Sequence, residues 1–233
     1  MKILLLPSAL CLFFLQIVTC QAVAQIHYRI EADYSLKEKS STGHENLMLG
    51  RVYFDKNYRQ MVFDISFPEK EILIINDTAS IYALSNRHEK HMLSTSLIDF
   101  SVLGLTLNGQ LEYFGLRETP FQLIKVEKDE GLVISTWELA DKRIESGVRK
   151  MMLSQKDNRL QGLISFNTND QIIAKQFFSE YILVSGLEIP SKVIQISYLP
   201  GGGEFKKITT YTNIKVNNQQ NESFYRYKQK AEN

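Results

Sequence analysis

The residues best suited to chemistry form no complete catalytic or metal-binding motif. His88-Glu89-Lys90-His91 is one residue short of the H-E-x-x-H spacing that places two histidines on one helix face around zinc. The other histidines, His27 and His44, are isolated. The stretch from Pro200 to Lys207 is rich in glycine but lacks the G-x-x-x-x-G-K spacing of a phosphate loop. We therefore expect a polar loop at residues 88–91 and neither a metal nor another cofactor.

Nucleophilic catalysis lacks its residues as well. There is no G-x-S-x-G elbow, and both cysteines, Cys11 and Cys20, lie in an N-terminal leader. Asp64, Asp99 and Glu138 are candidates for the paired carboxylates of a glycosidase. An exported hydrolase with acidic catalytic residues is therefore the weaker alternative. Because no motif supports it, we expect a protein that is not an enzyme.

The leader has the form of a secretory signal peptide. Lys2 precedes an apolar stretch from Ile3 to Val18, and Ala22-Val23-Ala24 provides an A-x-A cleavage site. The stretch is short for a membrane-spanning helix, which needs about 20 residues. We expect residues 1–24 to be removed and the protein to be exported to the periplasm of a Gram-negative bacterium.

A competing cleavage site overlaps the leader. Ile17-Val18-Thr19-Cys20 is close to a bacterial lipobox, although Thr19 stands where Gly, Ala or Ser is preferred. Cleavage there would leave an outer-membrane lipoprotein, tethered at Cys20, with a binding or structural role. Cleavage after Ala24 would instead leave a chain without cysteine and without disulfides. Both interpretations stay open.

The charge balance argues against nucleic acid as a partner. The chain has 27 Lys+Arg and 26 Asp+Glu, so loss of Lys2 with the leader brings the formal charge to zero. The basic run Tyr225–Lys230 lies at the C-terminus, where we expect a solvated tail. The predicted organisation is a signal peptide (1–24), one domain (25–217) and a polar C-terminal tail (218–233).

Alternation of apolar and polar residues predicts a mainly β domain with antiparallel pairing. Met61, Phe63, Ile65 and Phe67 are apolar and their neighbours Asp64 and Ser66 are polar, which is typical of a half-buried strand. Tyr28–Lys37 fits either a strand or a helix. Pro200–Gly203 predicts a hairpin loop. The other expected strands are 47–54, 72–75, 81–84, 132–139, 160–166, 193–198 and 207–216.

One segment favours a helix. Ser94-Thr95-Ser96 can cap a helix over Leu97–Leu105, in which Ile98, Val102 and Leu105 form an apolar stripe, and Asn108-Gly109 would end it. Alternation from Leu103 to Leu107 also fits a strand. An apolar helix over a curved antiparallel sheet either encloses a cavity for an apolar ligand or completes a solid core.

The stretch from Gly50 to Asp77 resembles the periplasmic outer-membrane lipoprotein carriers, the LolA-like proteins. The resemblance rests on a glycine-led strand ending in a basic residue, a strand running into proline, and an aliphatic strand followed by a turn and an aromatic strand. Tyr181–Pro190 is similar to the Gly-x-x-x-Pro turn of related lipoprotein-sorting proteins. The chain lacks the glycine of the family's Asp-Gly turn, and no proline follows Lys56. The matching positions are Gly50, Lys56, Pro68, Ile72–Ile75, Asn76-Asp77 and Ile81-Tyr82.

The resemblance implies a mainly β (α+β) fold, an incomplete, half-open antiparallel β-barrel with a helical lid. It also implies a monomer that binds lipid or lipoprotein acyl chains and meets inner- or outer-membrane lipoprotein machinery. Lys56 would be a basic rim group, with a solvated surface lysine as the alternative. For every lining residue, plain core packing is the alternative. The implied lining is Met61, Phe63, Ile65 and Ile74, with Leu97, Phe100 and Leu103 from the lid and Trp137 opposite.

Overall fold

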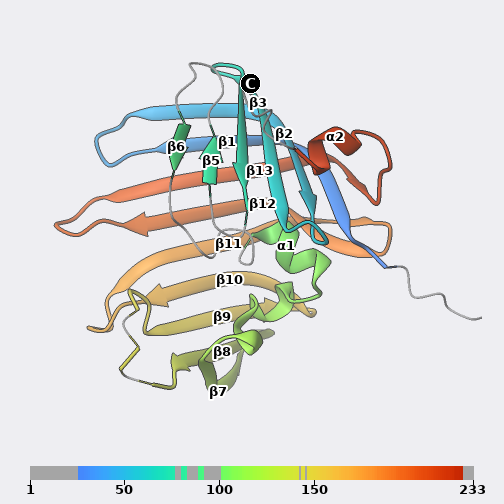
Figure 1. Ribbon diagram of the computed structural model, residues 1–233. Coiled ribbons are helices and arrows are strands. Elements are labelled where there is room, and N and C mark those ends of the chain that lie inside the picture. The colour runs from blue at the N-terminus through green and yellow to red at the C-terminus, as the bar shows by residue number, and fades with distance from the viewer. Residues whose placement is uncertain are drawn as a thin grey trace, which may run out of the picture.

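The computed structural model describes residues 26–76, 80–82, 89–91, 101–141, 143–144 and 146–227, and it describes 80–82 and 89–91 by their backbone only. Eleven strands form one antiparallel sheet in the order β4-β3-β2-β1-β13-β12-β11-β10-β9-β8-β7 (Figure 1). These strands are β1 (Arg29–Lys39), β2 (Glu45–Asp55), β3 (Gln60–Phe67), β4 (Glu71–Ile75), β7 (Phe121–Asp129), β8 (Leu132–Leu139), β9 (Lys150–Lys156), β10 (Arg159–Phe166), β11 (Ile172–Val184), β12 (Leu187–Tyr198) and β13 (Glu204–Val216).

The sheet joins the two ends of the chain at its centre. Every neighbouring pair is consecutive in sequence except β1 and β13, which pair from Ile30↔Val216 to Lys39↔Lys206. The segment predicted as either strand or helix is thus the strand β1 from Arg29 onward, and Ile30, Ala32 and Tyr34 alternate into the core. Because β4 and β7 remain edges, the barrel is half-open, as predicted.

Short helices accompany the sheet. The helix α1 (Val102–Leu107) begins at Ser101, whose Oγ accepts a hydrogen bond from the Gly104 amide at 3.0 Å, and it ends at Asn108. This confirms the helical choice for residues 102–105 and the predicted end; the expected cap at 94–96 and residues 97–100 lie outside the described residues. The remaining elements are the 3-10 helices η1 (Leu111–Tyr113) and η2 (Leu116–Glu118), the helix α2 (Glu222–Tyr225), and the hairpin of β5 (Ser80–Tyr82) and β6 (Glu89–His91).

No helix in the described part of the chain is long and apolar enough to cross a membrane.

Gly50 marks a close approach between β2 and β3. The register shifts between Leu49 and Gly50, and a Cβ atom at Gly50 would lie 2.3 Å from the carbonyl oxygen of Asp64. Only glycine fits there, because real Cβ atoms do not approach backbone oxygen so closely. The glycine that leads the family-like strand therefore has a packing reason in this chain.

The C-terminal segment corrects the expectation of a solvated tail. Tyr225 is fully buried, and it packs with Tyr53, Val62 and Ile74 on the outer face of β2–β4. Its hydroxyl donates to Glu31 Oε2 at 3.1 Å. The described part of the predicted tail, residues 218–227, is therefore a packed part of the domain.

Candidate functional site

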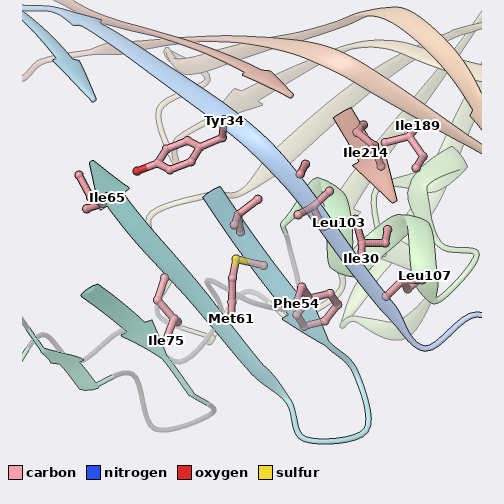
Figure 2. Close-up of a cluster of buried hydrophobic side chains, with 12 residues drawn as sticks. Ile30, Tyr34, Phe54, Met61, Ile65, Ile75, Leu103, Leu107, Ile189 and Ile214 are labelled. Atoms are coloured by element: carbon pink, nitrogen blue, oxygen red, sulfur yellow. The ribbon is translucent and has the colours of Figure 1, made fainter. Parts of the chain in front are cut away.

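The inner face of the sheet carries one large apolar cluster at the β1–β4 end. Figure 2 shows Ile30, Tyr34, Phe54, Met61 and Ile65 projecting to the same side from β1, β2 and β3. Several side chains that pack against this cluster are only partly buried. They are Leu36, Met48, Phe63, Leu73, Val184, Leu187, Tyr211 and Val216.

The helix α1 divides this apolar surface in two. Leu103 and Leu107 face the first cluster, at the end that holds Ile30, Ile189 and Ile214 (Figure 2). Val102 and Leu105 instead join a second cluster formed with β8–β11. All six residues of α1 are buried, so the helix lies as a wedge between two apolar halves of the inner face.

Lys56 holds the C-terminal end of α1. It lies in the turn between β2 and β3, and its Nζ donates a hydrogen bond to the Leu107 carbonyl oxygen at 3.2 Å. A helix C-terminus has unpaired carbonyls and partial negative charge, so an ammonium group is favourable there. Lys56 was expected as a basic rim group or a solvated lysine; the structure makes it a half-buried contact between the sheet and α1.

The turn that positions Lys56 is itself fixed by a buried ion pair. Asp55 is fully buried and lies 3.0 Å from Arg29, which is 4% exposed. The other Asp55 oxygen accepts hydrogen bonds from the amides of Asn57 and Tyr58 at 2.9 and 3.3 Å. Arg29 also pairs with Glu222 at 2.6 Å and lies over the Tyr225 ring. The C-terminal segment, β1 and the turn beneath α1 are thus linked by one polar network.

The predicted lining residues do not all share one surface. Met61 and Ile65 belong to the first inner cluster, Phe63 packs against it, and Leu103 reaches it from α1. Trp137 is buried in the second cluster, on the other side of α1, where its indole donates to Ser135 Oγ at 3.0 Å. Leu97 and Phe100 lie outside the described residues.

Ile74 requires a correction. It pairs with Val62 and packs with Tyr53 and Tyr225 on the outer face, so it cannot line the inner surface with Met61 and Phe63. In its place the neighbours Leu73 and Ile75 face inward. Four consecutive aliphatic residues carry no alternation, so only the register with β3 reveals which of them point inward.

The inner face carries a pair of tyrosines that the sequence did not predict. Tyr34 pairs with Tyr211 across β1 and β13. The Tyr34 ring meets Phe63 edge-on at 5.2 Å, and its hydroxyl contacts Met48 Sδ at 3.9 Å. Burial raises the pKa of Tyr34 to about 12, and burial together with the nearby Tyr34 raises the pKa of Tyr211 to about 12. Both phenols therefore stay neutral donors in an apolar setting.

The outer face differs in character. A groove of about 560 Å³ there is lined by the charged residues Asp33, Arg51 and Asp64 together with Leu49 and Tyr53, and Arg51 pairs with Asp33 at 2.8 Å. Burial of apolar ligand is unfavourable against such a surface. The inner face is the apolar one.

The acidic residues considered for glycosidic chemistry are not a pair. Asp64 lies on β3 and Glu138 on β8, and seven strands of the sheet separate them. Asp99 lies outside the described residues. Glycosidase carboxylates must flank a single bond within about 10 Å, so Asp64 and Glu138 cannot act together.

No group of three or more His, Cys, Asp or Glu side chains among the residues with described side chains is arranged to hold a metal ion. His88 lies outside the described residues, and His91 is described by its backbone in β6. Glu89–His91 form the strand β6, so the polar loop predicted for residues 88–91 is wrong at these three positions.

Known proteins resemble this chain in three-dimensional structure but not in sequence. Neither a family model nor a curated protein sequence matches the chain. A LolA superfamily protein from Nitrosomonas europaea matches with a TM-score of 0.56 and 12% identity over 85% of this chain and 90% of its own. A DUF1329 family protein from Desulfovibrio piger matches with a TM-score of 0.59 and 12% identity over 86% of this chain and 90% of its own. A putative outer membrane lipoprotein-sorting protein domain from Vibrio parahaemolyticus matches with a TM-score of 0.55 and 12% identity over 85% of this chain and 90% of its own.

In this chain β4 and β7 are the edges of the sheet, and α1 lies on its inner face. The chain has the LolA-like fold, an incomplete antiparallel barrel.

Proposed function

We propose that the protein is an exported lipid or lipoprotein carrier that holds acyl chains on the inner face of β1–β4. One observation carries this proposal. Leu36, Met48, Phe63 and Leu73 pack on the inner cluster and yet remain only partly buried, although α1 covers the neighbouring part of the same face. Partly exposed apolar residues that continue a buried cluster are suited to an apolar ligand.

The helix α1 would act as the lid of this surface. Lifting α1 removes Leu103 and Leu107 from the first cluster and Val102 and Leu105 from the second, which costs roughly 6–12 kcal/mol, at 1.5–3 kcal/mol for each fully buried side chain. An acyl chain of about sixteen carbons gains roughly 12 kcal/mol on full burial, at about 0.8 kcal/mol for each CH₂. One chain can therefore displace the lid, and the hydrogen bond from Lys56 to Leu107 would help to return it.

The chemistry needed for carriage agrees with what the site provides. Shielding acyl chains from water requires apolar area and a movable cover, and it requires neither a nucleophile nor a metal. The neutral phenols of Tyr34 and Tyr211 would donate hydrogen bonds to ester or amide oxygens near the head of the ligand. Two of the similar structures are a LolA superfamily protein and a putative outer membrane lipoprotein-sorting protein domain, which supports a periplasmic role of this kind.

Native mass spectrometry of the mature protein from its own periplasm and membrane fractions tests the proposal. A chain that begins at Gln25 and retains acyl lipid or lipopeptide is expected. The variant Phe63→Glu places a charge on the apolar face and should weaken binding of a synthetic triacylated lipopeptide by roughly tenfold or more.

Phe177→Glu is the matched control. Phe177 is 44% exposed on β11, whereas its neighbour Phe178 is buried in the second cluster of the inner face, so Phe177 points to the outer face. Its substitution should leave lipopeptide binding unchanged. An empty protein that begins at a lipidated Cys20, or equal binding by both variants, would contradict the carrier function.

A further inference from the structure

The strand β7 is an uncovered edge of the sheet. Among the described residues it pairs with β8 alone, and Figure 1 shows no labelled element beyond it. After Phe121 every residue of β7 is exposed. The opposite edge strand, β4, lies against β5 instead. Of the two edge strands of the half-open barrel, β4 is therefore accompanied by another strand and β7 is not.

This edge carries exposed apolar side chains, whereas edge strands usually carry charged residues or proline that prevent pairing with another strand. Leu123, Ile124 and Val126 are 48%, 57% and 53% exposed. Leu123 pairs with Trp137 and Val126 with Ser135, both of which are buried on the inner face, because a bulge at Ile124 shifts the register between them. Leu123 and Val126 thus extend the inner apolar surface to the edge, where unpaired backbone groups are a template for another strand.

The charges of β7 indicate which strand fits. Lys125 and Glu127 flank Val126 on the other face of the strand, and they are exposed and pair with each other at 2.7 Å. A partner strand would extend this pair into a network of four alternating charges. In an antiparallel pair of two β7 strands with its two-fold axis at Val126, each Lys125 lies opposite the partner's Glu127. Axes through Lys125 or Glu127 would instead place like charges opposite each other. The strand is self-complementary in one register.

We propose that two copies of this chain associate through β7, antiparallel and centred on Val126. The partner strand would complete the backbone hydrogen bonds of the edge and cover Leu123, Ile124 and Val126. The two inner faces would then adjoin across the two-fold axis. This inference does not depend on the proposed function, and it replaces the monomer that the family resemblance implies.

Sedimentation velocity of the mature protein tests the proposal over a concentration series. The wild type is expected to form a concentration-dependent dimer. Lys125→Glu and Glu127→Lys each set like charges in both cross-strand positions, and each should weaken the dimer roughly tenfold or more. A mixture of these two variants should form a heterodimer, because every cross-strand position is then complementary. The double variant Lys125→Glu/Glu127→Lys should dimerise with itself.

Lys39→Glu is the control for net charge. Lys39 pairs with Glu45 beside the β1–β2 hairpin and is 60% exposed, far from β7 in the sheet order. It should dimerise as the wild type does, and circular dichroism should report the same fold for all variants. A monomeric wild type, a wild-type complex with a different protein in place of a second copy, or a dimer that survives Lys125→Glu would each overturn the proposal. Failure of the variant mixture to pair would overturn it as well.

Discussion

The Nζ atom of Lys56 donates a hydrogen bond to the carbonyl oxygen of Leu107 at 3.2 Å. This contact ties the turn after β2 to the last residue of α1, the helix that covers part of the inner face. Because Asp55 shapes the same turn, the position of the helix depends on the ion pair between Asp55 and Arg29.

Loss of the Lys56 ammonium group should loosen α1. We expect Lys56→Met to reduce the free energy of unfolding by about 0.5–1 kcal/mol, since one hydrogen bond to a helix C-terminus is lost. Hydrogen exchange should show faster exchange at the amides of Leu105 and Asn108, which bond within α1. Lys70→Met, at an exposed lysine in the β3–β4 turn, is the control. Equal exchange in the two variants would show that Lys56 does not hold the helix.

Removal of Arg29 should be far more damaging. Arg29→Met leaves the carboxylate of Asp55 buried without its partner, which costs about 3–5 kcal/mol. Urea denaturation measures this loss. Arg51→Met, at a half-exposed pair with Asp33, should cost at most about 1 kcal/mol.

A second change should partly restore the Arg29 variant. Asp55→Asn removes the buried charge and keeps an oxygen that can accept from the Asn57 and Tyr58 amides. The double variant Arg29→Met/Asp55→Asn should therefore be more stable than Arg29→Met alone. A double variant that is less stable would show that the charge of Asp55 is not the cause.

Glu31 should make anchoring of the C-terminal segment depend on pH. Burial alone would raise the pKa of Glu31, but hydrogen bonds from Asn221, Asn218, Lys215 and Tyr225 hold that pKa below its ordinary value of 4.5. A carboxylate with a lowered folded-state pKa contributes stability above the unfolded-state value and loses it as pH falls through the folded-state value.

The measurement compares unfolding of the wild type and Glu31→Gln in urea from about pH 7 to about pH 3. We expect the wild type to be more stable at neutral pH and its advantage to shrink as the pH falls below 4.5. An advantage that stays constant over this range would exclude a lowered pKa at Glu31.

Gly50→Ala should destabilise the β2–β3 pair. The added methyl group would lie 2.3 Å from the Asp64 carbonyl oxygen, so the two strands must separate. We expect a loss of about 1–3 kcal/mol in the free energy of unfolding, as for other overpacked sites. Gly147→Ala is the control, because nothing lies within 4 Å of its added Cβ atom. Similar melting temperatures for both variants would contradict the close approach.

Much of the fold could be predicted because a half-buried strand shows alternating apolar and polar residues within its own short segment. Met61 and Ile65 alternate with polar neighbours, and both face the inner cluster as predicted. Leu132–Leu139 is a strand with the predicted bounds. The resemblance over Gly50–Asp77 also indicated the half-open barrel that the similar structures confirm.

Contacts between distant segments could not be read in the same way. Ile74 faces outward because β4 pairs with β3 in the register Val62↔Ile74, and a run of four aliphatic residues does not encode that register. The basic run at Tyr225 resembled a solvated tail, yet Glu31 accepts from Tyr225 across 194 positions of sequence. Lys56 gained its role only when α1 came to lie beside the turn.

The sequence by itself determined the strand pattern and the apolar character of the inner residues, because alternation and burial follow from each strand alone. The tertiary structure decided which face each run presents, which edge stays open and which charges meet. The physical reason is that register, twist and the seating of α1 depend on interactions summed over the whole sheet, and no local segment contains them.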